Sequence, residues 1–434
     1  MVMKSVRVGI LGLGTVGSGV YELLKKNREV IQMKTGVFVE VVKCVDINPE
    51  RKKQLGIPNE YFTSSTEEVV DDPAIDIVVE LIGGTDVARD LVLKALGRKK
   101  HVVTANKALL AIHLREIFQS VLQNRVELGF EGSVGGGIPI IKTIREALVG
   151  NQINRIVGIL NGTTNFILTK MTRDGLDFQV ALRIAQELGF AEADPSLDIS
   201  GGDSRHKITI LSSLAFNTFV EISSVYVEGI ESIERRDLVY AGELGFVLKL
   251  LAIAEKKEDG ISVKVHPALI SRENPLAAIN GEDNAIMVYS DFLGKSMYSG
   301  KGAGAKPTAS AVVADIIDIA LRTINGRAYT GSPYAFSQSL KPIPFEKSRS
   351  RYYFRFHVLD RPGILSKIAG ILGDNNISIA SVIQKESEEE HEYVPLVMMT
   401  HTALEADVLK AIQLIDRLPE LEGKSRLIRV IDEE

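Results

Sequence analysis

The stretch 189–210 gathers residues that can carry out acid–base chemistry between two helical segments. Glu192, Asp198 and Asp203 supply carboxylates, and Lys207 supplies an ammonium group. Asp203 and Lys207 are four residues apart, so in a helix they lie on one face, one turn from each other. A lysine placed in this way can donate a proton and stabilise negative charge that develops on a substrate oxygen. The same pattern is also typical of a solvated loop followed by a surface ion pair, and the surrounding elements decide between the two interpretations.

A glycine-rich turn follows the first apolar segment. The β-branched run 6–11 leads directly into Gly12, Leu13, Gly14, Thr15, Val16 and Gly17. Glycines at these positions permit a tight turn, close approach of a pyrophosphate to the backbone and close packing of the next helix on the strand. A second strand, 37–45, ends in Asp46, whose carboxylate can accept a hydrogen bond from an adenosine ribose hydroxyl. This order favours dinucleotide binding over a glycine-rich turn that binds nothing.

Two further strand–helix units continue the same domain. The short apolar segments 75–80 and 101–104 are each followed by a helical pattern, which predicts a parallel, doubly wound α/β sheet. Such a sheet binds ligands at the carboxyl ends of its strands. Thr104 and Lys107 lie at that end of the second segment, so we expect both on the ligand side. The alternative for Lys107 is a surface lysine in the first turn of a helix.

Two motifs after this sheet are rich in glycine or in small polar residues. The segment 131–141, EGSVGGGIPII, can turn its carbonyl groups inward, which suits a bound ligand or a monovalent cation held by oxygen atoms. A plain domain crossover is the alternative, since glycine and proline also mark crossovers. The strand 153–159 leads into 161–165, NGTTN, which we interpret as a polar pocket wall. A helix cap formed by Thr163 or Thr164 explains part of this pattern.

The region 225–289 predicts a second domain with a mixed sheet. Its clearest strands are 261–265 and 285–289, and a charged helix is expected at 244–257. The region offers no chemistry of its own, but it is large enough to form a dimer interface.

The rest of the chain predicts a return to the first domain and then a third domain. A glycine-rich loop, 300–308, precedes an apolar helix, 309–323, which can bring the chain back to the nucleotide-binding sheet. The proline-containing interval 325–350 is predicted to be a linker. The final residues predict a ferredoxin-like βαββαβ unit. Its expected elements are a strand at 353–359, a helix at 364–375, a strand at 377–384, an acidic turn at 386–390, a strand at 393–400, a helix at 404–418 and a strand at 425–430.

The composition limits the partners and the compartment. A chain of 434 residues suggests about three domains, at a typical size of roughly 150 residues each. A net charge of -5, with 25% charged residues, gives no reason to expect nucleic acid or an anionic membrane as a partner. The single cysteine excludes an intrachain disulfide, and we find no signal peptide or membrane span, so we expect a soluble cytoplasmic protein. The seven histidines lack the spacing of a transition-metal site.

Five motifs occur in an order that resembles the homoserine dehydrogenases with a C-terminal ACT regulatory domain: GILGLGTVG, TANK, EGSVGGGIPII, GILNGTTN and LGFAEADPSLDISGGDSRHK. The resemblance covers nearly the whole chain. It implies reversible, NAD(P)H-dependent reduction of L-aspartate 4-semialdehyde to L-homoserine, a step in threonine, methionine and isoleucine biosynthesis. The implied organisation is a Rossmann-type dinucleotide-binding domain at 1–135 completed by a helix at 305–325, an α+β catalytic and dimerisation domain at 136–304, a linker at 326–350 and a ferredoxin-like ACT domain at 351–434.

The resemblance also implies roles for individual residues. Catalysis is expected from Lys107 and Lys207. Substrate binding is expected from Gly189, Glu192, Asp198, Asp203 and Thr163. Cofactor binding is expected from the turn Gly12 to Gly17 and from Asp46, Thr104, Lys107 and Gly302. A Na+ or K+ ion is expected at Glu131, Val134, Gly136 and Ile138, mainly through carbonyl groups. An amino-acid effector, threonine, is expected near Asp360, Pro362, Gly363 and Asn376. The expected assembly is a homodimer or a homotetramer.

The chemistry of the reaction suits these residues. Hydride transfer to an aldehyde carbon produces an alkoxide, which needs a proton and a positive field. We expect Lys207, fixed by Asp203, to donate the proton and Lys107 to polarise the carbonyl; the reverse assignment of the two lysines stays open. Each lysine would depress the pKa of the other, which helps one of them to act as a base in the oxidative direction. Glu192 and Asp203 suit the ammonium group of the substrate.

The cofactor preference is predicted from the end of the second strand. Asp46 would repel the 2′-phosphate of NADP, which favours NAD or the use of both cofactors. Arg51, Lys52 and Lys53 follow closely and keep NADP open.

Two other functions fit part of the pattern. Aspartate-semialdehyde dehydrogenase acts on the same aldehyde but needs a cysteine nucleophile, and the only cysteine, Cys44, lies within the second strand. A non-catalytic regulator that senses nucleotides and amino acids would also contain an ACT-like domain. The spacing of Asp203 and Lys207 argues against it, because a sensor has no need of a proton donor.

Overall fold

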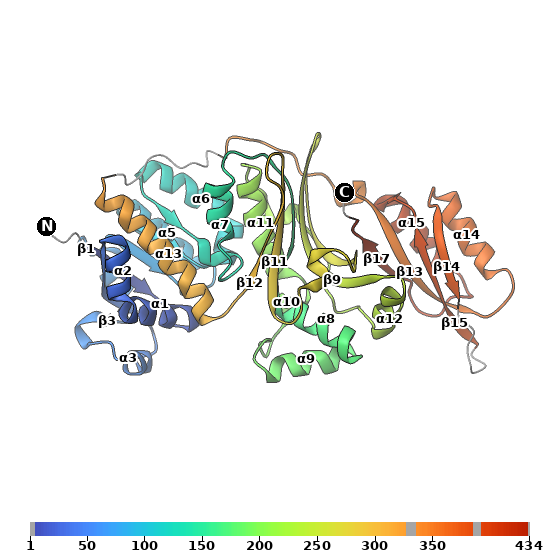
Figure 1. Ribbon diagram of the computed structural model, residues 1–434, viewed down its shortest axis with the longest axis horizontal. Helices are drawn as coiled ribbons and strands as arrows, with labels where there is room; N and C mark the ends of the chain where they lie inside the picture. The colour runs from blue at the N-terminus through green and yellow to red at the C-terminus, as the bar shows by residue number, and fades with distance from the viewer. Residues whose placement is uncertain (1–4, 327–335, 385–391, 433–434) are drawn as a thin grey trace. The chain divides into compact units, whose positions relative to one another are not determined.

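The computed structural model describes residues 5–326, 336–384 and 392–432 (Figure 1). The chain forms two compact units: the first contains Met1–Gly162, Asp203–Ser223 and Asp283–Leu340, and the second contains Thr163–Gly202, Ser224–Glu282 and Lys341–Glu434. The acidic turn expected at 386–390 and part of the expected linker, 327–335, lie outside the described residues. Within the described ranges, no helix is long and apolar enough to cross a membrane. The domain boundaries given above stay a prediction.

The first unit is built on a six-stranded parallel sheet in the order β3-β2-β1-β4-β5-β6. Its strands are β1 (Ser5–Leu11), β2 (Phe38–Val45), β3 (Phe62–Thr63), β4 (Ile77–Glu80), β5 (His101–Thr104) and β6 (Leu128–Gly129). β1 pairs with β2 on one side and with β4 on the other, so the strand order reverses at β1. Sheets of this kind bind dinucleotides at the carboxyl end of that strand. The predicted parallel, doubly wound α/β fold is confirmed.

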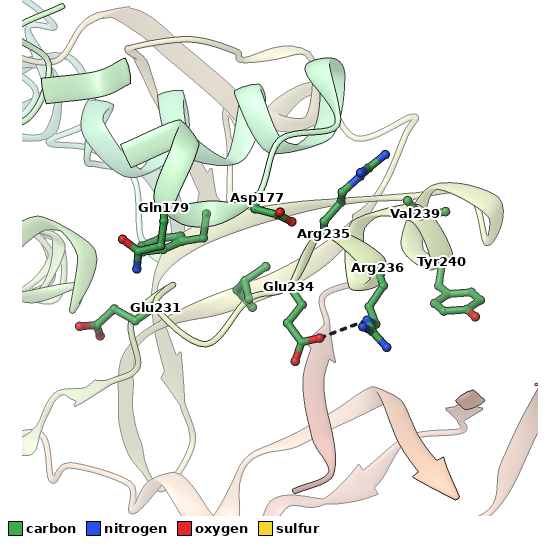
Figure 2. A pocket seen from close by; sticks show the side chains of 10 residues that line it. Asp177, Gln179, Glu231, Glu234, Arg235, Arg236, Val239 and Tyr240 are labelled. Carbon is green, nitrogen blue, oxygen red and sulfur yellow. Dashed lines mark ion pairs between the residues drawn. The ribbon is translucent and has the colours of Figure 1, made fainter. Parts of the chain in front are cut away.

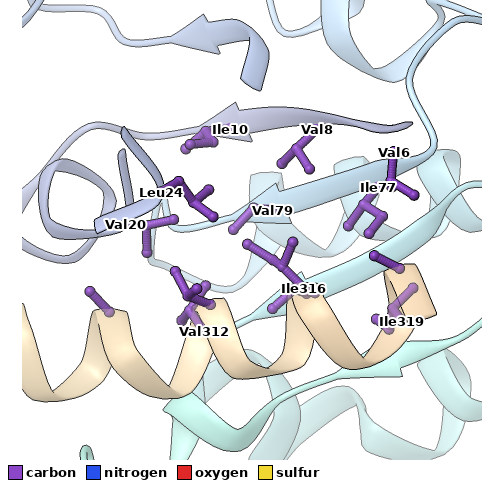
Figure 3. Packing of buried hydrophobic residues seen from close by; sticks show 14 of the residues in the cluster. Val6, Val8, Ile10, Val20, Leu24, Ile77, Val79, Val312, Ile316 and Ile319 are labelled. Atoms are coloured by element: carbon purple, nitrogen blue, oxygen red, sulfur yellow. The ribbon is translucent and has the colours of Figure 1, made fainter. Parts of the chain in front are cut away.

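A helix from late in the chain completes the hydrophobic core of this sheet. The helices between its strands are α1 (Thr15–Lys26), α2 (Arg28–Thr35), α3 (Glu50–Leu55), α4 (Glu67–Val70), α5 (Asp86–Gly97) and α6 (Lys107–Asn124). The late helix is α13 (Ala305–Ile324), which packs against α1. Val312, Ile316 and Ile319 of α13 lie in one buried cluster with β1, β4 and α1 (Figure 3). The β-branched residues of β1 and β4 are buried because helices cover a parallel sheet on its faces.

Three antiparallel strands also belong to the first unit: β7 (Ile153–Ile159), β11 (Asp283–Ser290) and β12 (Gly294–Lys301). β11 lies between the other two. The expected glycine-rich loop at 300–308 is shorter than predicted, because β12 continues to Lys301 and α13 begins at Ala305. Pro307 does not delay the helix, since the first turn of a helix has no intrahelical partner for its backbone N–H groups.

The predicted helix at 244–257 is wrong, because this segment of the second unit forms a strand. It is β9 (Phe246–Lys257), which pairs along its whole length with β10 (Gly260–Ser271), and short β8 (Tyr226–Val227) lies beside β10. Leucine, alanine, lysine and glutamate favour a helix. Seven successive residues of β9, from Leu248 to Ala254, are buried, so the strand lacks the alternation that would reveal it in the sequence. The other elements of this part are α8 (Gly162–Asp174), α9 (Phe178–Glu187), α10 (Ser196–Ile199) and α12 (Arg235–Glu243).

The C-terminal part of the second unit has the predicted βαββαβ order. Its elements are β13 (Arg349–Leu359), α14 (Ile364–Asp374), β14 (Ile379–Gln384), β15 (Tyr393–Thr400), α15 (Glu405–Ile415) and β17 (Arg426–Val430), with a short additional strand, β16 (Ala403–Leu404). The sheet order is β17-β13-β15-β14. Tyr352, Phe354 and Phe356 of β13 share a buried cluster with residues of α14 and α15. Alternate residues of β13 therefore face the two helices.

The opposite face of β13 is fastened to the rest of the second unit by a buried ion pair. Arg355 Nε donates a hydrogen bond to Asp237 Oδ1 of α12 at 2.6 Å, and the hydroxyl of Tyr353 donates to the same oxygen at 3.2 Å. β17 also pairs with β10, through Ala268 and Arg429. The ferredoxin-like sheet is thus continuous with the β9–β10 hairpin.

Candidate active site

The ends of β4 and β5 position Lys107. The hydroxyl of Thr104 donates a hydrogen bond to Glu80 Oε2 at 2.6 Å, which ties the two strand ends together at the carboxyl edge of the sheet. Asn106 then caps α6, since its side chain accepts a hydrogen bond from a backbone N–H of the first turn at 3.1 Å. Lys107 is the first residue of this capped helix, and its side chain is 38% exposed.

Asp203 and Lys207 lie on the first two turns of α11 (Gly202–Ala215). Lys207 Nζ donates a hydrogen bond to Asp203 Oδ2 at 2.7 Å, so the predicted pairing one turn apart is present. The side chain of Asp203 is only 2% exposed and that of Lys207 only 8%, so the pair is not a solvated surface ion pair. α11 is buried around most of its circumference, which explains why its sequence has no clear apolar stripe.

The carboxylate of Asp203 bridges two lysines. Its Oδ1 lies 2.7 Å from Nζ of Lys107, and its Oδ2 lies 2.7 Å from Nζ of Lys207. The side-chain amide of Asn161 donates a further hydrogen bond to Oδ2 at 2.9 Å, and Lys207 Nζ also donates to the carbonyl of Leu160 at 2.6 Å. Sequence reasoning misses the Leu160 contact, because a backbone acceptor leaves no signal in the residue types.

The electrostatics of this cluster keep Asp203 ionised. Burial alone would raise the pKa of Asp203, but the ammonium groups of Lys207 and Lys107 outweigh burial and hold the pKa well below its usual range. A buried carboxylate that carries its charge can in turn keep two ammonium groups close to each other. The arrangement therefore holds two ammonium groups around one fixed negative charge, and ammonium groups can stabilise or protonate an oxygen anion.

The four other predicted substrate-binding residues all lie in the second unit. The hydroxyl of Thr163 donates hydrogen bonds to the carbonyl of Phe190 at 2.6 Å and to Asp198 Oδ2 at 3.1 Å. Gly189 immediately precedes Phe190 and has a positive φ of 75°. Glu192 follows in the same loop and is exposed.

Asp194, which lies in the same loop, has a structural role. Its carboxylate accepts a hydrogen bond from the backbone N–H of Ser196, in the first turn of α10, at 3.1 Å.

The turn after β1 fits a bound pyrophosphate. Gly12 has a positive φ of 94°, and a Cβ built on it would lie 2.6 Å from the carbonyl oxygen of Leu81. A Cβ on Gly17 would lie 1.9 Å from the carbonyl oxygen of Gly12, whereas one on Gly14 would meet nothing within 4 Å. The first and third glycines are thus required by packing, and the second leaves open space in front of α1. A helix N-terminus that faces open space can receive a phosphate group.

Asp46 is tied to this turn. Its Oδ2 accepts a hydrogen bond from the backbone N–H of Leu13 at 2.8 Å, and its Oδ1 accepts one from the backbone N–H of Asn48 at 2.8 Å. The carboxylate therefore lies beside the glycine-rich turn at the end of β2. Each oxygen still has a lone pair for a ribose hydroxyl.

Glu131, the first predicted cation ligand, is buried and holds the start of α7 (Ile140–Lys142). Its Oε1 accepts a hydrogen bond from the N–H of Ile141 at 2.9 Å, and its Oε2 accepts one from the N–H of Lys142 at 2.7 Å. Its own N–H donates to Asp315 Oδ2 of α13 at 2.7 Å. Burial, followed by repulsion from Asp315, raises the pKa of Glu131 to about 7. The remaining predicted ligands, Val134, Gly136 and Ile138, offer backbone carbonyls, so the donor set consists of oxygen atoms as a hard cation requires.

Gly302 lies against this loop. A Cβ built on Gly136 would lie 2.6 Å from the carbonyl carbon and oxygen of Gly302, and Gly137 N–H donates to the carbonyl of Lys301 at 3.0 Å. The predicted cofactor residue and the predicted cation loop therefore form one packed structure.

The predicted effector residues do not form one cluster in the chain. Asp360, Pro362 and Gly363 precede α14, whereas Asn376 follows it. Because a helix rises by about 1.5 Å per residue, the two groups are separated by roughly 16 Å, the length of α14. A single site within one ACT domain therefore does not contact all four residues, and the assignment of these residues to an effector stays a prediction.

The second unit also contains a pocket of ≈ 660 Å³ (Figure 2). It is lined by Asp177, Phe178, Gln179, Glu231, Ile233, Glu234, Arg235, Arg236, Val239 and Tyr240. Charges of both signs line it, and Glu234 pairs with Arg236 at 3.3 Å. None of these residues has a predicted role in hydride transfer.

Family models match three successive segments of the chain. They are described as "Homoserine dehydrogenase, NAD binding domain" at residues 12–131, "Homoserine dehydrogenase" at 139–317 and "ACT domain" at 352–420. The homoserine dehydrogenase of Pseudomonas aeruginosa is 43% identical over 433 residues, which is 99% of this chain and 99% of the relative.

Solved structures give the same result. A homoserine dehydrogenase from Thiobacillus denitrificans aligns with a TM-score of 0.94 at 43% identity and covers 99% of both chains. A hyperthermophilic archaeal homoserine dehydrogenase in complex with NADPH aligns with a TM-score of 0.63 at 30% identity, over 73% of this chain and 98% of that one. The chain belongs to the homoserine dehydrogenase family of NAD(P)-dependent oxidoreductases and carries a C-terminal ACT domain.

Proposed function

We propose that the chain catalyses the reversible, NAD(P)H-dependent reduction of L-aspartate 4-semialdehyde to L-homoserine, with Lys207 as the proton donor. The observation that carries this assignment is the contact of both Lys107 and Lys207 with the single buried carboxylate of Asp203. Such a cluster has a clear use in carbonyl reduction, where a negative oxygen must be stabilised and then protonated.

The two lysines are proposed to have different roles in the reaction, because their surroundings differ. Lys207 is fixed by Asp203 and by the carbonyl of Leu160, so its ammonium group is oriented before the reaction begins. When bound, NAD(P)H supplies the hydride that attacks carbon 4 of the aldehyde. Lys207 then transfers a proton from Nζ to the resulting alkoxide, and Lys107, the more exposed of the two, polarises the carbonyl oxygen. In the oxidative direction the neutral amine of Lys207 takes the hydroxyl proton of homoserine.

The proposed substrate contacts involve several carboxylates. Glu192 is exposed, so its charge is available for the ammonium group of the substrate. Asp198 and Thr163 already contact each other, and with Gly189 they are proposed to bind the rest of the amino acid. Asp203 contacts both lysines, so its first role is to position them, and an interaction with the substrate ammonium group is additional to that role.

The proposed cofactor residues are those of the glycine-rich turn, Asp46, Thr104, Lys107 and Gly302. The open space at Gly14 before α1 supports pyrophosphate binding there. We propose NAD, or both cofactors, because Asp46 lies beside the turn and would repel a 2′-phosphate. The archaeal relative was solved with NADPH, so the preference has to be measured in this chain.

We further propose a monovalent cation, Na+ or K+, at Glu131, Val134, Gly136 and Ile138. The buried carboxylate of Glu131 and the backbone carbonyls of this glycine-containing loop supply oxygen atoms of the kind that hard cations prefer. The ion would stabilise the loop against which Gly302 packs, and through it the cofactor side of the site.

The ACT domain supports a proposal of feedback regulation by an amino acid, with threonine as the expected effector. Asp360, Pro362 and Gly363 lie at the N-terminal end of α14, where backbone N–H groups can bind a carboxylate. Asn376 at the other end of the helix would have to contact a different ligand or a different copy of the domain. A homodimer or homotetramer in the cytoplasm completes the proposal.

Oxidation of homoserine by the full-length chain tests the proposed activity. Reduction of NAD+ or NADP+ is followed at the nicotinamide absorbance, with and without homoserine. Homoserine-dependent turnover supports the proposal. Binding of nucleotide without turnover at any pH would instead favour a non-catalytic sensor.

A further inference from the structure

Asn284 on β11 has a side-chain amide that the fold leaves unsatisfied. The residue is 0% exposed, and neither Nδ2 nor Oδ1 has a hydrogen-bond partner among the described residues. Leaving a buried polar group without a partner destabilises the folded state. The causes of such a group in a native protein include local strain, a catalytic role, an internal water molecule and a bound ion.

The surroundings of this amide point to the cation loop. Asn284 pairs with Gly300 in the β11–β12 ladder, and Gly302 lies two residues further along the same face. A Cβ built on Gly302 would lie 2.0 Å from Nδ2 and 2.5 Å from Oδ1 of Asn284. The amide therefore occupies the space that any side chain at position 302 would fill.

The same backbone segment meets the predicted cation ligands on its other side. A Cβ on Gly136 would lie 2.6 Å from the carbonyl group of Gly302, and one on Gly300 would lie 3.5 Å from Cγ1 of Ile138. Gly302 therefore lies against both Asn284 and Gly136, and Gly300, the ladder partner of Asn284, lies beside Ile138.

We propose that the side-chain oxygen of Asn284 is a further ligand of the monovalent cation, in addition to the oxygen atoms of the 131–138 loop; this inference rests on the cation site proposed above. A carboxamide oxygen is a neutral, hard donor that is equivalent to a backbone carbonyl for Na+ or K+. It adds no charge to a site that already contains the carboxylate of Glu131.

The burial of Asn284 also argues against a direct contact between its side chain and the cofactor. Both polar atoms have almost no accessible surface, so a nicotinamide ring cannot reach them without a rearrangement of Gly302. A dehydrated cation is small enough to be enclosed between packed backbone segments. The cation would link the 131–138 loop to β11, and so hold Gly302 in place.

If Asn284 has a purely structural role, its substitution should affect stability in a different way. If the amide only fills space, an apolar residue of similar shape removes an unsatisfied polar group, and Asn284→Leu is neutral or stabilising in every salt. If the amide binds a cation, the same substitution weakens the response of the protein to that cation.

The test is thermal unfolding of the full-length chain in NaCl, KCl and tetramethylammonium chloride at one ionic strength. A ligand that binds only the folded state raises the Tm in a concentration-dependent way, so titration with NaCl or KCl gives an apparent Kd. The variants are Asn284→Leu, Asn284→Ala and Asn284→Asp, with Glu131→Gln as a loop-ligand variant. Asn375→Leu is the matched control, because Asn375 is a buried asparagine of the ACT domain.

If Asn284 binds the cation, the wild type and Asn375→Leu should unfold at a higher Tm in NaCl or KCl than in tetramethylammonium chloride. Asn284→Leu and Asn284→Ala should need roughly tenfold to a hundredfold more cation for the same shift, whereas Asn284→Asp, which retains an oxygen, should keep the response. If Glu131→Gln weakens the response and the Asn284 variants do not, the cation site stands and the role of Asn284 is overturned. If the wild type shows no difference among the salts, the cation site itself fails and the role of Asn284 fails with it.

Discussion

Asp203 and Lys207 form a buried ion pair on one helix, with 2.7 Å between Oδ2 and Nζ, and the second oxygen of the same carboxylate lies 2.7 Å from Lys107. The spacing of four residues brings Asp203 and Lys207 together through local helix geometry alone. Lys107 joins them only through the tertiary fold, because it lies on α6 at the edge of the parallel sheet. One carboxylate therefore connects a local pairing to the nucleotide-binding sheet.

Substitution of Asp203 tests whether this carboxylate positions the lysines. Asp203→Asn keeps the shape but removes the charge, so two ammonium groups lose their counter-charge. We expect the kcat of homoserine oxidation to fall by about 10²-fold or more and the free energy of unfolding to fall by about 3 kcal/mol, as when one partner of a buried pair is removed. Steady-state kinetics and urea denaturation measure the two effects. Asp194→Asn, an exposed carboxylate of the preceding loop, is the control, and a wild-type kcat in Asp203→Asn would remove the positioning role.

Substitution of Asp46 tests the cofactor preference. Asp46→Ala removes a negative charge beside the glycine-rich turn, and the ratio of kcat/KM for NADP+ to that for NAD+ should rise roughly fivefold, which corresponds to about 1 kcal/mol of charge repulsion. Both cofactors should bind more weakly, because Asp46 also accepts the N–H of Leu13. Glu50→Ala removes a nearby exposed carboxylate and should leave the ratio unchanged. An unchanged ratio in Asp46→Ala would show that this residue does not set the preference.

Threonine tests the proposed regulation. Saturating threonine should inhibit homoserine oxidation or change the assembly of the wild type, as measured by initial rates and by light scattering after size exclusion. Asp360→Ala, at the N-terminal end of α14, should require several times more threonine for the same effect. If threonine changes neither property, the ACT domain serves oligomerisation or binds another effector.

Lys249 gives a prediction for the dependence of stability on pH. It is 2% exposed on β9, it donates to Asn165 Oδ1 at 3.0 Å, and burial, followed by repulsion from Arg173, lowers its pKa to about 8. Between that value and the unfolded pKa of about 10.4, the unfolded chain binds a proton that the folded chain does not, so stability rises with pH in this window.

Lys249→Met should remove this rise. The difference in unfolding free energy between the wild type and Lys249→Met should change by about 2–3 kcal/mol in favour of the wild type from pH 7.5 to pH 10.5. Urea denaturation at the two pH values measures the difference. Lys257→Met, an exposed lysine at the end of the same strand, should show no such change. A constant difference for Lys249→Met would mean that the buried lysine keeps its ordinary pKa.

The sequence predicts best those parts of the fold that depend on short-range rules. The glycine-rich turn, the short parallel strands and the βαββαβ order all follow from local patterns of glycine, β-branched residues and helix spacing. β9 does not, because its residues favour a helix and only its pairing with β10 makes it a strand. The local pattern also begins α13 at 309 instead of 305, since Pro307 looks like a helix breaker until it is placed in a first turn; the resemblance alone implies the start at 305.

In the candidate site, too, the contacts that follow from local patterns are predictable and those made by the tertiary fold are not. The spacing of Asp203 and Lys207 predicts their contact, and the carboxyl end of β5 predicts the side of the sheet on which Lys107 lies. No pattern of residue types predicts that both lysines share one carboxylate, or that the carbonyl of Leu160 accepts from Lys207. Asn284 also gives no signal, because an asparagine within an apolar strand looks like any other polar interruption until its burial is known.

The role of Lys207 as the proton donor is tested by the rate of homoserine oxidation by Lys207→Ala, measured with saturating NAD+ and with saturating NADP+ beside the wild type and Lys107→Ala. If Lys207 transfers the proton, Lys207→Ala should lose about 10²-fold to 10⁴-fold in kcat with either cofactor while it still binds NADH, as followed by nicotinamide fluorescence. Lys107→Ala should be impaired less in kcat. A kcat near that of the wild type in Lys207→Ala, in protein that is folded and binds NADH, would contradict the assignment of Lys207 as the proton donor.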